Sequence, residues 1–186
     1  MKKLLFIKEF IMHFKSTGSL IPSSKFLTKS MVDEIDFQGN SVIVELGPGT
    51  GVFTREILKR KNKDTKLIVI ELNEAFYEEL KEILPMDENT FLINGCASKL
   101  ENILKELKVE KIDYVISGLP FLNFKPQERE AIFKEINKIL VGKFILFQYT
   151  KKVKDHIEGY FRIDKIKRVF LNFPPAYVFV ATKKKI

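Results

Sequence analysis

A glycine-rich turn that follows a short apolar run constrains the fold of this chain more than any other stretch. Val42-Ile43-Val44 is mostly β-branched and is typical of a buried strand, and Gly47, Gly49 and Gly51 follow at every second position. Glycines leave room where a backbone must turn tightly or approach a ligand. A helical pattern over 52–61 completes the nucleoside-binding corner of an α/β sheet. A plain strand-turn-helix connection is the alternative.

Two carboxylates indicate which ligand binds at the predicted strand, glycine turn and helix. Glu45 precedes the glycines, and its charge would repel a pyrophosphate but could accept hydrogen bonds near the ammonium group of S-adenosylmethionine. Glu71 ends the next apolar run, 66–70, where an acidic residue can take the ribose hydroxyls of a nucleoside. The sequence therefore predicts S-adenosylmethionine as the cofactor. The residues predicted to bind it in these two segments are Glu45, Gly47, Pro48, Gly49, Gly51, Glu71 and Leu72.

A third strand is predicted over 90–94, and the adenine loop of such folds usually follows it. Cys96 stands where an aspartate would be expected to accept a hydrogen bond from the adenine amino group, and a thiol accepts only weakly. Backbone groups around Cys96 and Ala97 are therefore expected to contact the adenine. No histidine lies nearby in the sequence, so the pattern does not favour a nucleophilic cysteine, and the chemistry requires no metal.

The methyl acceptor is expected beside a fourth strand, 111–116. The catalytic candidates after it are Ser117, Gly118, Leu119, Pro120 and Phe121. Their backbone carbonyls could accept hydrogen bonds from an amine, and Phe121 offers an aromatic face to a cationic nitrogen. Tyr149, at the end of a predicted strand over 143–148, could face the acceptor site, where this residue or water could relay the departing proton. Tyr177 is a further candidate for the acceptor site. The alternative is a proline-containing strand exit with no role in substrate binding.

The net charge of +8 is concentrated at the two ends of the chain. Residues 1–30 carry +5 and residues 151–186 carry +7, which leaves −4 for the middle. Only five of the 32 basic residues are arginine, and lysine suits a diffuse anionic surface better than bidentate reading of a base edge. An anionic lipid surface and a nucleic-acid backbone both stay possible as partners, with an organism-wide lysine bias as the alternative explanation of the charge.

The first 15 residues carry the pattern of an amphipathic helix. Its apolar face would comprise Leu4, Phe6, Ile7, Phe10, Ile11 and Phe14. Such a face, flanked by lysines, could lie in a membrane interface or pack on the domain. A second helix is predicted to run from Ser23 or Ser24 to Ile35, with both serines and Phe26 as candidate lining of the cofactor pocket. We expect residues 1–36 to cover a catalytic domain formed by 37–186.

At five places the chain resembles the bacterial phospholipid N-methyltransferases that methylate phosphatidylethanolamine. The shared motifs are Gly18-Ser19-Leu20-Ile21-Pro22-Ser23-Ser24, Glu45-Leu46-Gly47-Pro48-Gly49-Thr50-Gly51, Ser117-Gly118-Leu119-Pro120-Phe121, Phe147-Gln148-Tyr149-Thr150 and Asn172-Phe173-Pro174-Pro175-Ala176. The resemblance implies a Rossmann-like α/β fold, with a seven-stranded sheet and an antiparallel C-terminal hairpin. It also implies N-methylation of a phospholipid headgroup amine at a membrane surface.

The same superfamily contains ribosomal RNA adenine dimethyltransferases, whose acceptor motif is Asn-Leu-Pro-Tyr. Gly118 replaces that asparagine and removes the side chain that orients an aromatic amine. RNA adenine N6-methylation and a non-catalytic cofactor-binding module stay open as alternatives. The single cysteine, the lack of a signal-peptide pattern and the absence of an apolar run of roughly 20 residues lead us to expect a cytoplasmic protein, peripherally attached to the membrane.

Overall fold

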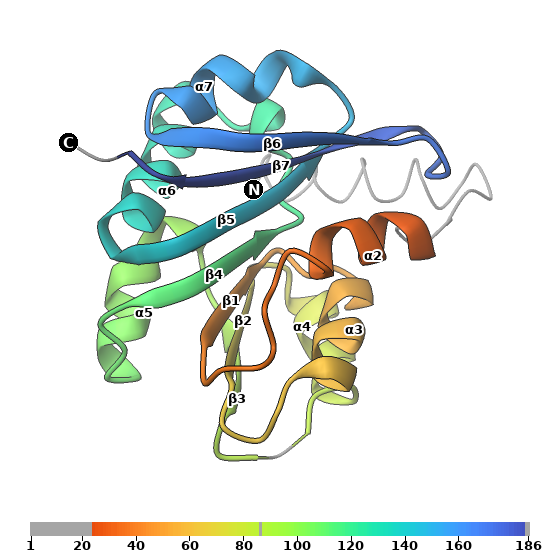
Figure 1. Ribbon diagram of the computed structural model, residues 1–186. Helices are drawn as coiled ribbons and strands as arrows, with labels where there is room; N and C mark the ends of the chain where they lie inside the picture. The colour runs from red at the N-terminus through yellow and green to blue at the C-terminus, as the bar shows by residue number, and fades with distance from the viewer. Residues whose placement is uncertain (1–23, 86, 185–186) are drawn as a thin grey trace.

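The computed structural model describes residues 24–85 and 87–184, and within them seven strands form one mixed sheet between two layers of helices (Figure 1). The strand order is β3-β2-β1-β4-β5-β7-β6. The strands are β1 (Val42–Leu46), β2 (Lys66–Glu71), β3 (Thr90–Asn94), β4 (Ile112–Ser117), β5 (Leu140–Gln148), β6 (Phe161–Val169) and β7 (Ala176–Lys183). The first five strands run parallel, and β7 pairs antiparallel with both β5 and β6. The predicted α/β sheet with a C-terminal hairpin is confirmed.

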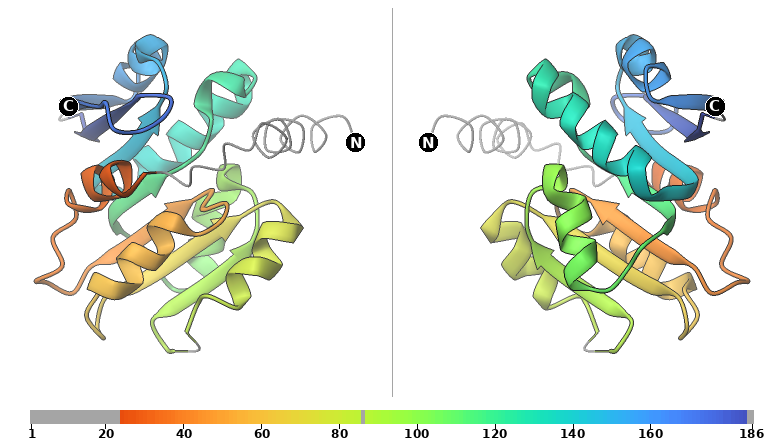
Figure 2. Two further views of the ribbon diagram at one scale, coloured as in Figure 1. Left: turned by 90° about the vertical axis from the view of Figure 1, so that its right-hand side faces the viewer. Right: turned by 90° about the vertical axis from the view of Figure 1, so that its left-hand side faces the viewer.

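Helices cover both faces of the sheet (Figure 2). One face packs against α2 (Lys25–Val32), α3 (Val52–Arg60) and α4 (Glu74–Lys81), and the other against α5 (Leu100–Glu106), α6 (Pro126–Ile139) and α7 (Lys154–Glu158). Short 3-10 turns precede three of these elements: η1 (Ala97–Lys99), η2 (Phe121–Asn123) and η3 (Lys151–Val153).

The parallel strands are apolar along their length because both of their faces are covered. In β2, Leu67 and Val69 pack on the side of α2, α3 and α4, whereas Ile68 and Ile70 pack on the opposite side. All four side chains are buried, and burying each contributes about 1.5–3 kcal/mol. A continuous apolar run, rather than an alternating one, is what such a strand requires.

The elements that carry the candidate site begin at residues suited to starting helices. Asn73 caps α4, with its side-chain oxygen accepting hydrogen bonds from the amides of Ala75 and Phe76 at 3.0 and 3.3 Å. In contrast, α3 begins after Gly51 with no side-chain cap. Its first amides therefore face the glycine turn without a side-chain acceptor.

Some expectations differ from the structure, and others lie outside the residues that it describes. The first strand of the C-terminal hairpin, expected over 166–170, is β6 and begins five residues earlier, at Phe161. The short helix α7 was not predicted. The expected helix over 1–15 and Ser23 lie outside the described residues, and the domain division at residue 36 stays a prediction. The helix expected after Ser24 is present as α2, whose Leu27 and Met31 are fully buried. In the part of the chain that the structure describes, no helix has the length and apolar character to cross a bilayer.

Candidate active site

Strand register brings the predicted site segments to one edge of the sheet. Leu46 pairs with Ser117, and Glu71 pairs with Asn94, so the carboxyl ends of β1 to β4 lie side by side. The glycine turn, Glu71, the Cys96 loop and the acceptor loop all lie at these strand ends. This edge is where ligands bind in open α/β sheets.

The glycine turn has the backbone that only glycine adopts without strain. Gly47, Gly49 and Gly51 have φ values of +66°, +57° and +74°. A Cβ atom at Gly47 would lie 2.5 Å from a methyl carbon of Leu119, and one at Gly51 would lie 2.9 Å from a methyl carbon of Leu80. Nothing lies within 4 Å of the corresponding position at Gly49. The turn is therefore packed closely at its ends and open at Gly49.

Glu45 is a fully buried carboxyl group with one oxygen that has no partner. Its Oε2 accepts a hydrogen bond of 2.7 Å from the hydroxyl of Thr54 in α3, whereas Oε1 is buried without a hydrogen bond in the described structure. Burial raises the pKa of Glu45 to about 8, and the charge of Glu71 adds to the increase while the Thr54 hydrogen bond opposes it. An orphaned acceptor at this position fits a ligand that brings a cation or a hydrogen-bond donor.

Glu71 is fixed at the end of β2 by two backbone amides. Its Oε2 accepts from the Gly49 amide at 3.1 Å, and its Oε1 accepts from the Asn73 amide at 2.8 Å. Burial raises its pKa, although these hydrogen bonds act in the opposite direction. Each carboxylate oxygen keeps a further lone pair, so Glu71 can accept hydrogen bonds from a pair of hydroxyls.

The residues expected around adenine flank the same edge. Pro48 is buried within the glycine turn, and Leu72, which follows Glu71, is 51% exposed. Ala97 is buried at the start of η1. Cys96 is partly buried, and its Sγ lies 3.1 Å from the hydroxyl oxygen of Ser98. An apolar side chain and a backbone loop are thus available here, together with a thiol that is already engaged with a neighbour.

The acceptor loop is fitted closely onto the glycine turn. The Gly118 amide donates to the carbonyl of Leu46 at 3.0 Å, and the buried Ser117 hydroxyl accepts from the Leu119 amide at 3.2 Å. A Cβ atom at Gly118 would lie 2.6 Å from the carbonyl oxygen of Gly47. From the other side, the Gln148 amide group donates to the Leu119 carbonyl at 2.9 Å. The two loops therefore form one packed unit with no room for a side chain at Gly118.

The remaining candidates of the acceptor region, Pro120, Phe121 and Tyr149, lie in different environments. Pro120 is partly exposed and leads into η2, whereas Phe121 is fully buried. The Phe121 ring packs on Phe133 with ring centroids 4.8 Å apart, so it belongs to the core and not to the open edge. Tyr149 is 39% exposed and packs edge-on against Phe147, and burial raises its pKa. The exposed aromatic surface near the acceptor loop is therefore that of Tyr149.

Ser24, a predicted cofactor-binding residue, caps α2. Its hydroxyl accepts from the Leu27 amide at 3.2 Å, and its own amide donates to the side-chain oxygen of Asn172 at 2.9 Å. The start of α2 is thereby attached to the β6–β7 turn.

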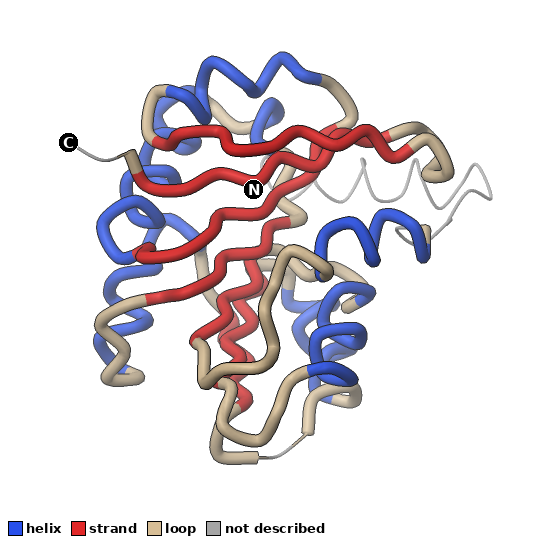
Figure 3. Tube along the Cα trace, in the orientation of Figure 1, coloured by secondary structure: helices blue, strands red, loops and turns tan. Residues whose placement is uncertain are grey.

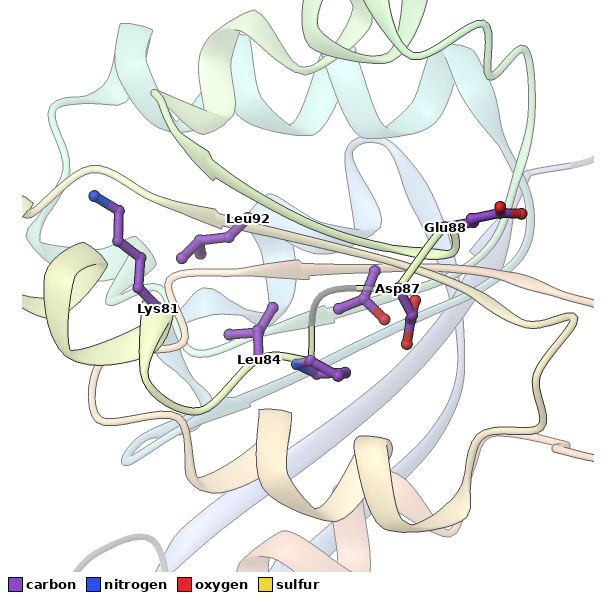
Figure 4. A pocket seen from close by; sticks show the side chains of 7 residues that line it. Lys81, Leu84, Asp87, Glu88 and Leu92 are labelled. Atoms are coloured by element: carbon purple, nitrogen blue, oxygen red, sulfur yellow. The ribbon is translucent and has the colours of Figure 1, made fainter.

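A surface cavity of about 470 Å³ lies away from the candidate site, between the end of α4 and the start of β3 (Figure 4). Its lining residues are Lys81, Leu84, Pro85, Asp87, Glu88, Thr90 and Leu92. Thr90 pairs with Leu67 near the start of β2, at the opposite end of the strand from Glu71. This cavity therefore belongs to the amino edge of the sheet and shares no residue with the site.

Three contacts that organise the site were not predicted from the sequence. They are the Thr54–Glu45, Gln148–Leu119 and Asn172–Ser24 hydrogen bonds. Thr54 could have been found, because the third position of a helix after a glycine turn faces back to the strand end. The other two join segments 29 and 148 residues apart, and no local pattern records such pairs.

Comparison with known sequences places this chain in a family. The family model described as ribosomal RNA adenine dimethylase matches residues 14–156. The chain is 32% identical over 175 residues to an ornithine lipid N-methyltransferase from Singulisphaera acidiphila, with 92% of this chain and 91% of the relative covered. It is 30% identical over 175 residues to ribosomal RNA small subunit methyltransferase A from Sulfurihydrogenibium sp., with 87% of this chain and 67% of the relative covered.

Solved structures show the same fold at low sequence identity. The 1,6-didemethyltoxoflavin-N1-methyltransferase of Burkholderia thailandensis, solved with S-adenosylhomocysteine, matches 99% of this chain and 89% of its own at a TM-score of 0.72 and 12% identity. The precorrin-6y C5,15-methyltransferase of Geobacter metallireducens matches 89% and 91% at a TM-score of 0.69 and 13% identity. With the family match over most of its length, this chain belongs to the ribosomal RNA adenine dimethylase family and is an S-adenosylmethionine-dependent methyltransferase.

Proposed function

We propose that this enzyme methylates the amine of a lipid headgroup, of the phosphatidylethanolamine or ornithine-lipid kind, at a membrane surface. The observation that carries the proposal is the close approach of Gly118 to the Gly47 carbonyl, 2.6 Å from where a Cβ atom would be. RNA enzymes of the superfamily use an asparagine at this position to orient an aromatic amine. At position 118 only backbone groups can meet the acceptor, which suits a small aliphatic amine. The nearly full-length similarity to an ornithine lipid N-methyltransferase supports this substrate class.

The cofactor is proposed to bind between the two buried carboxyl groups. The unpaired oxygen of Glu45 would accept from the ammonium group of the methionine part, and Glu71 would accept from the ribose hydroxyls. Gly49, with open space at its Cβ position, would lie against the ligand, and Leu72, Cys96 and Ala97 would flank the adenine. When bound, S-adenosylmethionine supplies an electrophilic methyl group.

The protein's contribution to methyl transfer would be orientation of the amine and removal of its proton. Carbonyls of the acceptor loop would hold the neutral nitrogen in line with the methyl group, and the Gln148 hydrogen bond to Leu119 keeps that loop in place. The ordinary pKa of a tyrosine hydroxyl is 10.0 and burial raises that of Tyr149 further, so this group is neutral near pH 7. Its oxygen would accept the departing proton while its own hydroxyl proton passes to water, so the side chain stays neutral throughout.

Replacing Glu71 by glutamine is expected to lower cofactor affinity roughly tenfold, because a charge-assisted hydrogen bond to the ribose is about 1–2 kcal/mol stronger than a neutral one. Isothermal titration calorimetry with S-adenosylhomocysteine measures this change. The matched control is Glu79→Gln, an exposed residue on α4, which should bind like the wild type. Equal affinity of the Glu71 variant and the wild type would contradict the proposed ribose contact.

Methyl transfer to lipid is the direct test of the substrate class. The protein is mixed with methyl-labelled cofactor and, in separate reactions, vesicles containing phosphatidylethanolamine, vesicles containing ornithine lipid, or unmodified ribosomal RNA. We expect label in a lipid extract and background levels in the RNA. The family model and the small-subunit relative favour RNA as the second candidate. Label in RNA with none in either lipid would replace the proposal with that candidate.

A further inference from the structure

The turn between β6 and β7 lies beside α2 (Figures 1 and 3). Its apolar side chains are exposed. We propose that this turn, residues 170–175, inserts into the interface of an anionic lipid surface. The inserted turn would hold the edge of the sheet that carries the active site against that surface. The proposal deepens the proposed function, on which it rests, by naming the surface that meets the membrane. Residues 170–175 are called the hairpin tip.

The hairpin tip presents side chains that are unfavourable in water. Phe170, Leu171 and Phe173 are 67%, 66% and 72% exposed, and Phe26 on α2 is 55% exposed. Single exposed apolar residues are ordinary, but several from one turn and its neighbouring helix form a patch. Transfer of such side chains out of water is the driving force that an interfacial segment needs.

The hairpin tip is held in place, so its apolar side chains are displayed on a rigid support. Asn172 is only 4% exposed and lies between the exposed side chains. Its side chain accepts from the Ser24 amide at 2.9 Å and donates to the Pro174 carbonyl at 2.7 Å. These two bonds attach the tip to the start of α2 and turn Asn172 inward while its neighbours stay outside.

Basic side chains surround the apolar ones. The guanidinium of Arg168 lies 4.5 Å from the ring centroid of Phe170, and the ammonium of Lys151 lies 5.2 Å from that of Tyr177. Two further exposed lysines, Lys25 and Lys152, are the sequence neighbours of Phe26 and Lys151. Within residues 24–85 and 87–184, none of these four cations forms a salt bridge with a carboxylate. Aromatic rings surrounded by such cations suit anionic headgroups.

The hairpin tip also lies at the edge where the chemistry takes place. β7 begins at Ala176, and its next residue, Tyr177, pairs with Gln148 at the end of β5. Gln148 in turn holds the Leu119 carbonyl of the acceptor loop, and the exposed Tyr149 follows it. A lipid surface that meets the tip is therefore brought to the acceptor loop, and its headgroup amines are brought with it.

A single tryptophan tests the insertion, because the chain contains none. Leu171→Trp, in vesicles of phosphatidylglycerol and phosphatidylethanolamine, is expected to shift its emission to the blue and to be quenched by lipids brominated near the headgroup. Val141→Trp is the matched control, since Val141 is 57% exposed at the start of β5, the opposite edge of the sheet. Its emission should not change. Vesicles of phosphatidylcholine alone should bind the protein at least tenfold more weakly.

Two results would overturn the inference. One is an emission of the Leu171→Trp variant that stays at its aqueous position while the protein sediments with anionic vesicles. The other is an emission of this variant that is blue-shifted and protected from quenching even without vesicles. That result would mean that residues 1–23 or a second copy of the chain covers the tip.

A paired variant separates this inference from the proposed function. Phe170→Ser with Leu171→Ser is expected to lower the vesicle-bound fraction and vesicle methylation at least tenfold. Cofactor binding and methylation of a monomeric short-chain phosphatidylethanolamine should match the wild type. Lipid methylation without tryptophan insertion would contradict the inference and leave the proposed function standing. Insertion without any lipid methylation would contradict the proposed function alone.

Discussion

Replacing Gly118 by alanine is expected to slow methyl transfer about 100-fold while the protein remains folded. The added Cβ atom would lie 2.6 Å from the carbonyl oxygen of Gly47, which is backbone and cannot rotate away. Relief requires the acceptor loop to move away from the glycine turn, and displacement of a reacting group by about 1 Å costs roughly 100-fold in rate. The φ of Gly118 is not in the left-handed region, so the effect arises from this contact and not from backbone strain.

Gly39→Ala is the matched control for this effect. Gly39 has nothing within 4 Å of its Cβ position and no positive φ, so this variant should retain wild-type activity. The measurement is the single-turnover rate with lipid vesicles, together with the thermal unfolding midpoint of both variants. An active Gly118→Ala enzyme would show that the two loops are not held as closely as the structure has them. Gly118→Asn should be equally slow and should not gain methylation of RNA.

Much of the fold, and the edge of the sheet at which the candidate site lies, could be predicted because the sequence signals for them are local. The apolar runs of β1 and β2 mark strands buried on both faces, and the glycines between β1 and α3 mark a turn with positive φ. Glu45 and Glu71 lie near the carboxyl ends of these two strands, so parallel pairing alone brings them to one edge. Neither step requires knowledge of contacts between distant segments.

The residues and elements that were misplaced or missed lack such local signals. Phe121 was expected at the acceptor, but Phe133 of α6 and Phe144 of β5 surround its ring in the core. In β6, an edge strand, the exposed positions are rich in charge, so its first half lacks an apolar pattern. The five-residue helix α7 is too short to show a helical period. Packing partners therefore decide the position of Phe121, whereas β6 and α7 lack a local pattern from which they could be predicted.

Replacing Glu45 by glutamine is expected to stabilise the cofactor-free protein while weakening cofactor binding. Burial raises the pKa of Glu45 from its ordinary 4.5 to about 8. Between these values the unfolded chain carries the ionised carboxylate while the folded protein keeps the proton, so the free energy of unfolding falls as pH rises through this range. Below pH 4.5 both states are protonated and the penalty disappears. At about pH 7 the penalty amounts to roughly 3 kcal/mol.

Glutamine has nearly the same shape and cannot ionise, so it removes this pH-dependent penalty. Its carbonyl oxygen can still accept from Thr54, and its amide replaces a group that already lacks a partner in the described structure. Urea unfolding should therefore give a larger free energy for Glu45→Gln than for wild type, with a difference that grows from about pH 5 to about pH 8. The exposed Glu79→Gln variant should follow the wild type at every pH. A difference that shrinks with rising pH would contradict the assignment of a neutral carboxyl group.

The same substitution should lower affinity for S-adenosylhomocysteine about 100-fold, because removing one charge of a buried pair costs about 2–5 kcal/mol. Since most of Glu45 is protonated near pH 7, binding of the ligand's ammonium group should release a proton from the wild type. Calorimetry in two buffers of different ionisation enthalpy measures that proton, and it should be missing from Glu45→Gln. Wild-type affinity in this variant would mean that the buried oxygen faces no ammonium group. Gain of stability with loss of binding would show that Glu45 is kept for its ligand, since a carboxyl group without one only weakens the fold.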